Sequence, residues 1–192
     1  MALNEDTLVQ QTTADYLRDA LGWRSEFAYN TEVLGPEGSF GRKSEQDVVL
    51  TRILGEKLIA LNPGLPDAAY RDALRQIVEV GAGLRGMAAN REKYHLLRDG
   101  VKVSYRKLDD TLEARTLRVL DFDTPENNDF LAVRELWVKG ELYRRRPDII
   151  GFVNGIPLLF IECKNIHKNL RKAYDQNLKD YQDTIPHLFH HN

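Results

Sequence analysis

The sequence predicts an α/β protein in which a mixed central sheet is flanked by helices and preceded by a helical annex. Apolar residues recur with a helical period through roughly the first hundred residues, and the period then changes to that of strands. An amphipathic helix follows the last two strands. The chain has 192 residues, close to the size of one domain. We therefore expect one domain over 1–192, with the annex at about 44–98 and the core at about 100–189.

Four helices are expected before the first strand of the core. In the first helix, Asn4 can cap the N-terminus, and Tyr16, Leu17 and Leu21 lie on one face. The Pro/Gly-rich loop 62–67 separates the second helix from the third. The expected helices span 3–21, about 49–61, 68–78 and about 90–97.

Alternating apolar residues predict the strands, and a helical period returns near the end of the chain. The expected strands span 101–105, 117–122, 130–138, 148–153 and 157–163. The final helix spans 168–183, with Tyr174 and Tyr181 on its inner face.

Composition excludes several classes of protein. Apolar residues make up 42% and charged residues 29%, as in ordinary globular proteins. The longest apolar stretch, 149–161, is interrupted by Asn154, Gly155 and Pro157, and it is too short to span a bilayer. The single cysteine, Cys163, excludes an internal disulfide and a Cys-rich zinc site. With an acidic N-terminus and no secretory signal pattern, we expect a cytoplasmic protein without membrane contact.

Positive charge gathers in one segment, although the formal net charge is -2. Residues 139–172 contain eight Lys or Arg and three acids, which gives 8 - 3 = +5. This segment suggests contact with a polyanion, but a run such as Arg144–Arg146 is more often a solvated strand end. On charge alone the second interpretation is favoured.

The hairpin formed by the last two strands carries the candidate chemistry. Asn154-Gly155 marks its turn. A simple two-residue turn would place Asp148 opposite residue 161 and Glu162 on the other face. A three-residue connection, or an equivalent bulge, pairs 153 with 157 and brings Asp148 opposite Glu162, with Lys164 on the same face. The sequence permits both registers, and we predict the second.

Two carboxylates brought together in this way repel each other, and a bound cation would offset the repulsion. At about 5 Å they repel by roughly 3 kcal/mol at an effective dielectric constant near 20. Hard oxygen ligands with open positions suit Mg²⁺, and a nearby ammonium can stabilise charge that develops on phosphorus. The predicted chemistry is metal-dependent phosphodiester hydrolysis. The simpler alternative is an acid–lysine pair at the mouth of a buried hairpin.

The segment from Pro147-Asp148 through Glu162-Cys163-Lys164 resembles the PD-(D/E)xK nuclease motif. Its surroundings resemble the N-terminal nuclease domain of the R (restriction) subunit of type I restriction-modification enzymes. The resemblance covers nearly the whole chain. It includes Leu-Gly-Trp (21–23), Asn-Pro-Gly-Leu-Pro (62–66), Asn-Asn-Asp-Phe (127–130), Leu-Tyr-Arg-Arg-Arg-Pro-Asp (142–148), Phe-Val-Asn-Gly-Ile-Pro-Leu (152–158) and Asn-Leu-Lys-Asp-Tyr-Gln-Asp-Thr-Ile-Pro-His-Leu-Phe (177–189).

This resemblance implies a PD-(D/E)xK restriction-endonuclease-like core, roles for three side chains and a set of partners. Asp148 and Glu162 would bind Mg²⁺, for which Mn²⁺ can substitute, Lys164 would assist attack, and the Cys163 carbonyl would also reach the metal. The substrate would be double-stranded DNA. The partners would be methylation and specificity subunits and the motor domains of the parent subunit. ATP would act only through those motors, since this chain has no phosphate-binding GxxxxGK[ST] loop.

Further site residues follow from the same resemblance. Related nucleases carry Gln-x-x-x-Tyr on the next helix, but here Gln176 lies five residues before Tyr181. Asn177, four residues before Tyr181, shares its face and is the better candidate to organise the site or touch DNA. A helix-dipole role explains Glu5 better than a catalytic one. The candidates for phosphate contacts are Arg144, Arg145, Arg146, Lys168, Arg171 and Lys172.

Three functional hypotheses follow. The first is a Mg²⁺-dependent DNA endonuclease domain without sequence readout of its own. The second is a catalytically idle, nuclease-like module that docks within the restriction complex through the annex at 46–97. Metal binding and DNA nicking distinguish these two. The third, a stand-alone repair nuclease or junction resolvase of the same superfamily, is disfavoured by the long annex.

Overall fold

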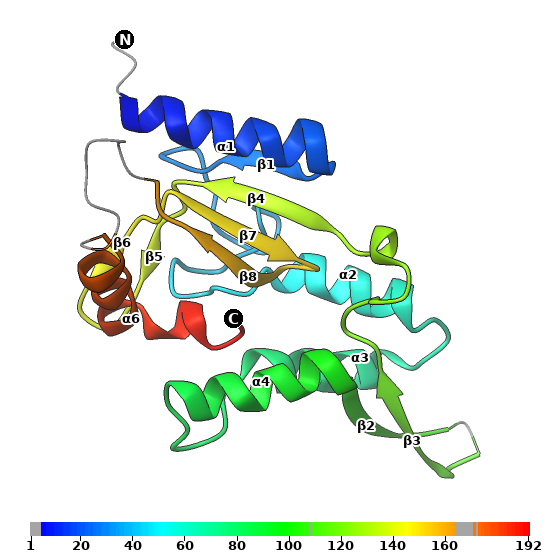
Figure 1. Ribbon diagram of the computed structural model, residues 1–192. Coiled ribbons are helices and arrows are strands. Elements are labelled where there is room, and N and C mark those ends of the chain that lie inside the picture. The colour runs from blue at the N-terminus through cyan, green and yellow to red at the C-terminus, as the bar shows by residue number, and fades with distance from the viewer. Residues whose placement is uncertain (1–4, 108, 164–170, 172) are drawn as a thin grey trace.

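A four-stranded mixed sheet lies at the centre of the molecule (Figure 1). The computed structural model describes residues 5–107, 109–163, 171 and 173–192. The strand order is β1-β4-β7-β8, in which β1 and β4 are parallel and the other neighbouring pairs are antiparallel. The expected mixed α/β class is confirmed. The strands span Arg24–Phe27 (β1), Phe130–Arg134 (β4), Ile149–Val153 (β7) and Ile156–Ile161 (β8).

Helix α1 (Glu5–Leu21) covers one face of this sheet (Figure 1). Its residues Ala14 and Leu17 pack against Ala132 and Ile149 of the strands. The inner face is rotated from the predicted one, because Tyr16 and Leu21 are 61% and 53% exposed. The buried stripe instead follows positions 10, 14 and 17, which have the i, i+4, i+7 spacing of one helix face.

The annex lies on the opposite side of the sheet from α1 and confirms the predicted helices (Figure 1). Its Leu54 and Leu58 are fully buried and belong to the same apolar cluster as Phe152 of β7. Within the described ranges, no helix combines the length and apolarity needed to cross a membrane. The annex elements are α2 (Thr51–Leu61), α3 (Asp67–Val78) and α4 (Met87–Asp99). The strand predicted at 101–105 as part of the core is β2 (Val101–Arg106), which pairs with β3 (Leu112–Leu117) in a separate two-stranded sheet and contacts α3.

The strand predicted at 117–122 is wrong, since β3 ends at Leu117. The Asn62 side chain accepts from the Arg118 backbone amide (2.8 Å) and donates to its carbonyl (2.8 Å). The Asp121 carboxylate accepts from the amides of residues 123 and 124. Because side chains satisfy this backbone, Val119 and Leu120 are buried in a loop rather than in a strand, while Phe122 is exposed.

The strand predicted at 130–138 is interrupted. It forms β4 and, after a break, β5 (Val138–Lys139), which pairs with β6 (Arg144–Arg145). Glu135 lies at the break with φ of 55°, a left-handed conformation that strand pairing does not tolerate. The chain therefore leaves the central sheet at this residue.

The turn of the β7–β8 hairpin packs against the start of α2 and is hydrogen-bonded to it. Asn154 and Gly155 have φ of 51° and 79°, as a type I′ turn requires. The Leu50 amide donates to the Gly155 carbonyl at 2.8 Å, and a Cβ at Gly155 would lie 2.6 Å from the Leu50 oxygen. The fully buried Asn154 amide donates to Val119 O at 2.8 Å. The closed end of the hairpin is thereby fixed in position.

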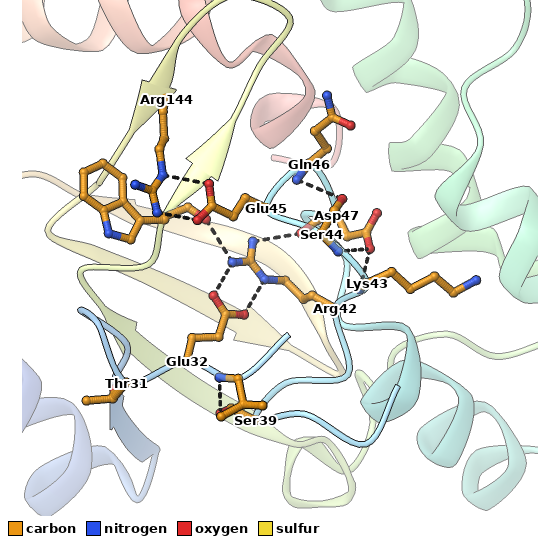
Figure 2. A network of polar contacts seen from close by, with 12 residues as sticks. Thr31, Glu32, Ser39, Arg42, Lys43, Ser44, Glu45, Gln46, Asp47 and Arg144 are labelled. Carbon is orange, nitrogen blue, oxygen red and sulfur yellow. Dashed lines mark hydrogen bonds and ion pairs between the residues drawn. The ribbon is translucent and has the colours of Figure 1, made fainter. Parts of the chain in front are cut away.

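A buried arginine joins the loop before α2 to the segment that leads into β5 (Figure 2). The side chain of Arg42 is fully buried and donates through Nε and Nη2 to both oxygens of Glu32, at 2.8 and 2.6 Å. Arg42 also donates to the carbonyls of Asp47 (3.0 Å) and Trp137 (2.9 Å). Such a bidentate pair supports the fold only while both partners are present.

Replacing Arg42 with Met should lower the free energy of unfolding by about 3–5 kcal/mol, because the Glu32 carboxylate would remain buried without its counter-ion. Urea denaturation of both proteins measures the difference. Arg52→Met is the matched control, since Arg52 is exposed and donates only to the Ser39 carbonyl at 3.1 Å among the contacts seen. A loss below 1 kcal/mol for Arg42→Met would contradict this account of the network.

Candidate active site

The open end of the β7–β8 hairpin brings two acidic residues together. At the turn, Val153 pairs with Ile156, so the predicted pairing of 153 with 157 is wrong. A bulge between Gly151 and Phe152 then shifts the register, and Ile149 pairs with Ile161. One further step of this register places Asp148 opposite Glu162. The predicted register of the open end is confirmed, and it arises from a bulge beyond a two-residue turn.

Two neutral donors hold the Asp148 carboxylate. Its Oδ2 accepts from the Cys163 backbone amide at 2.6 Å, and its Oδ1 accepts from Nε2 of Gln10 at 3.2 Å. Asp148 and Cys163 are half-buried, whereas Gln10 is 3% exposed. These contacts fix the carboxylate from the neighbouring strand and from α1 together.

The Glu162 carboxylate is held by the helical segment that follows the hairpin. Asn177 Nδ2 donates to Oε1 at 3.2 Å, and the Tyr181 hydroxyl donates to Oε2 at 3.2 Å. The tyrosine ring also packs edge-on against Phe160 of β8, with centroids 5.0 Å apart. The predicted common face of Asn177 and Tyr181 therefore meets one of the two predicted metal ligands.

This helical segment is less regular than predicted. Residues Ala173–Leu178 form a π-helical turn (η2), followed by α6 (Lys179–Thr184) and the 3₁₀ turn η3 (Pro186–Phe189). A π turn changes which residues share a face, and single π turns occur often at functional sites. Accordingly, Tyr174 is 69% exposed rather than inward, while Asn177 and Tyr181 both reach Glu162.

The pKa of Tyr181 is raised. Burial is the largest cause, followed by the negative charge of Glu162, its hydrogen bond with the tyrosine, and the charge of Asp148. Tyr181 therefore stays protonated at neutral pH and remains a donor to Glu162. The contribution of Asp148 also indicates that both acids lie near one phenol.

Each arginine of the run 144–146 has an ion-pair partner within the chain. The Arg144 guanidinium also stacks over the ring of Trp137 at 3.8 Å. These pairs join β6 and the residue after it to segments that are distant in sequence. The pairs are Arg144–Glu45 (Nε to Oε2, 2.7 Å), Arg145–Asp180 (2.9 Å) and Arg146–Glu135 (3.0 Å). A DNA phosphate would have to compete with these carboxylates.

Several predicted site residues lie outside the described residues, namely Lys164, Lys168 and Lys172. The side chains of Glu5 and Gln176 are likewise outside the description. Arg171 is exposed. The roles predicted for all six remain predictions.

Two residues near Asp148, Gln10 and Glu135, were not predicted from the sequence. The amide of Gln10 donates to Glu135 at 3.4 Å as well as to Asp148. A polar residue in the stripe that Ala14 and Leu17 complete was the available signal for Gln10. The sequence around Glu135 gives no comparable indication that this residue contacts Gln10. The position of Glu135 beside the hairpin depends on the break after β4, where its φ is 55°.

The donor set at the open end suits a hard divalent cation. Two carboxylates and a backbone carbonyl leave room for the several waters that Mg²⁺ retains. Across the part of the chain that the structure describes, no group of three or more His, Cys, Asp or Glu side chains is arranged to hold a metal. The oxygen donors fit Mg²⁺ better than a softer metal that prefers nitrogen or sulfur.

The structure defines the chain as a mixed α/β protein with two acidic residues at the open end of its β7–β8 hairpin. The chain belongs to the family described as "Type I restriction enzyme R protein N terminus", which matches residues 2–192.

The chain is similar to two curated proteins along nearly its whole length. It is 36% identical over 99% of its residues to "Type I restriction enzyme HindI endonuclease subunit" of Haemophilus influenzae. It is 26% identical over 97% of its residues to "Putative type I restriction enzyme MjaIXP endonuclease subunit" of Methanocaldococcus jannaschii. The chain spans 18% of the length of each of these relatives.

The raised pKa of Tyr181 predicts a pH dependence of stability. Its folded-state pKa lies above the ordinary value of 10.0, so the unfolded chain ionises first. The stabilisation is present below pH 10 and is lost as pH rises through the folded-state pKa. Tyr181→Phe should therefore lose less stability than the parent above about pH 10, as urea denaturation at several pH values would show. Tyr174→Phe, at an exposed position, is the control and should follow the parent.

Proposed function

We propose that this chain is the Mg²⁺-dependent DNA endonuclease domain of a type I restriction enzyme R subunit, with a PD-(D/E)xK nuclease fold. The observation that carries the proposal is the register of the β7–β8 hairpin, in which Ile149 pairs with Ile161, since one further step of that register would set Asp148 opposite Glu162. Membership of the R-protein family and the endonuclease names of the relatives support the same activity.

Asp148, Glu162 and the Cys163 carbonyl would hold the metal. When bound, Mg²⁺ or Mn²⁺ supplies Lewis-acid stabilisation for charge on the phosphate oxygens. Lys164, the residue after Cys163, would orient the attacking water and stabilise negative charge on the phosphodiester. Asn177 and Tyr181 keep both Glu162 oxygens oriented by donating one hydrogen bond to each.

A cavity lies beside Glu162 at the open end of the hairpin. It has a volume of about 820 Å³ and is lined by Glu162 together with Phe160 and Tyr174. Double-stranded DNA is the proposed substrate, and Lys168, Arg171 and Lys172 are the proposed phosphate contacts. Because Arg144, Arg145 and Arg146 each pair with a carboxylate, their proposed role in binding DNA is secondary to their role in the fold.

The chain spans 18% of its relatives, so the rest of the activity is proposed to come from other parts of the assembly. Methylation and specificity subunits would supply sequence recognition. Motor domains of the parent subunit would use ATP. This division explains why a nuclease domain without sequence readout can serve a site-specific system.

Asp148→Asn should reduce Mg²⁺-dependent nicking of supercoiled plasmid by at least roughly 100-fold, because it removes a charged ligand from the metal. Nicking is measured with and without Mg²⁺ or Mn²⁺, for the chain and for the complete restriction complex. In the complex, ATP hydrolysis should be retained.

Asp180→Asn is the matched control. It removes an acid that is 52% exposed, belongs to α6 and pairs with Arg145, and it should leave nicking within about threefold. If the parent chain neither binds the metal nor nicks DNA, and Asp148→Asn changes nothing in the complex, the catalytic proposal fails. The idle docking module would then be the better description.

A further inference from the structure

Gln10 is a buried amide placed against the acids of the proposed site. It lies on α1 with 3% of its surface exposed. Its Nε2 lies 3.2 Å from Asp148 Oδ1 and 3.4 Å from Glu135 Oε1. An amide nitrogen carries two hydrogens, so one Gln can donate to both carboxylates at once. A buried amide with two acidic acceptors is held in one orientation.

The second acceptor is itself anchored. The Glu135 backbone amide donates to the Asp148 carbonyl at 3.0 Å, which ties the two residues together through the main chain. The Glu135 carboxylate pairs with Arg146 at 3.0 Å, and the Arg146 guanidinium lies 4.2 Å from the centroid of Tyr29. Glu135 keeps a φ of 55°, which costs a non-glycine residue roughly 1 kcal/mol. The contacts of Glu135 with Asp148 and Arg146 therefore hold it in this conformation.

The Gln10 side chain is neutral, and this affects how Asp148 could bind a metal ion. A cation at this position would neutralise Asp148 and repel a bound metal ion. A neutral amide orients the carboxylate and leaves its charge in place. Each carboxylate oxygen has two lone pairs, so the hydrogen bonds from Gln10 and Cys163 do not by themselves prevent Oδ1 and Oδ2 from facing a cation.

We propose that Gln10 is a positioning residue for Asp148: it sets the orientation of that carboxylate for metal binding, with Glu135 and Arg146 as its anchor. This inference rests on the proposed function, since it assigns a purpose to a contact with a proposed metal ligand. Partners of this kind, one layer away from the metal, typically change metal affinity or activity by about 10- to 100-fold.

The test is the affinity of the 192-residue chain for Mn²⁺, measured by calorimetric titration and by the electron paramagnetic resonance signal of free Mn²⁺. Gln10→Met keeps nearly the same volume and removes the amide, so affinity should fall by about 10- to 100-fold. The matched control is Gln11→Met. It alters the next residue of α1, whose amide donates to Asp15 at 2.9 Å and accepts from Arg134 of β4, with neither contact reaching Asp148 or Glu135. The control should bind as the parent does.

Gln10→Asn provides a second variant that preserves a buried amide. It is one methylene shorter and cannot span both carboxylates, so it should also weaken Mn²⁺ binding, by at least about fivefold. Thermal unfolding of the metal-free variants verifies that each is folded. If Gln10→Met does not fold, Gln10→Asn decides the question.

The outcomes separate the two proposals. If Asp148→Asn abolishes Mn²⁺ binding and the folded Gln10 variants bind as the parent does, the positioning role is overturned and the metal site stands. If the parent and Asp148→Asn bind Mn²⁺ equally, the metal site itself fails and the role of Gln10 fails with it. Weakened binding for the Gln10 variants alongside an unchanged Gln11→Met supports the inference.

Discussion

The register of one hairpin decides whether the two acids can act together. Asp148 and Glu162 lie on different strands, so their side chains share a face only in one of two registers. The turn alone pairs Val153 with Ile156 and, continued without a bulge, would direct Glu162 to the opposite face. The extra residue in β8 changes the register by one, and Ile149 then pairs with Ile161. The proposed chemistry depends on that shift.

The closed end of the hairpin is fixed by contacts that oppose a slip of the whole strand. Asn154 and Gly155 are pinned by hydrogen bonds to Val119 and Leu50, and a side chain at Gly155 would collide with the Leu50 carbonyl. A slip of the whole strand would break these contacts and expose Phe152, which is fully buried. The bulge is therefore the low-energy way to bring 148 opposite 162.

Periodicity predicted the annex helices because their apolar faces follow from local spacing. It did not choose between the two hairpin registers, since the alternation permits both and gives no signal for the bulge. Periodicity gave a wrong strand after β3, because the side chains of Asn62 and Asp121 accept hydrogen bonds from backbone amides that a neighbouring strand would otherwise bind. It also failed for the arginines, since the pairing of Arg144 with Glu45 joins positions 99 residues apart. Gln10 was missed because the buried stripe of α1, through positions 10, 14 and 17, is rotated by part of a turn from the predicted face.

The donors seen around the two acids are chemically alike. Gln10 and the Cys163 amide contact Asp148, while Asn177 and Tyr181 contact Glu162, and all four are neutral. The raised pKa of Tyr181 keeps its proton in place, because burial disfavours the phenolate and ionisation beside Glu162 and Asp148 would add a further negative charge. These four donors restrict rotation of the acids and add no positive charge of their own. They set the orientation of the two carboxylates before any cation is bound. The arginines of the run 144–146 pair with Glu45, Asp180 and Glu135.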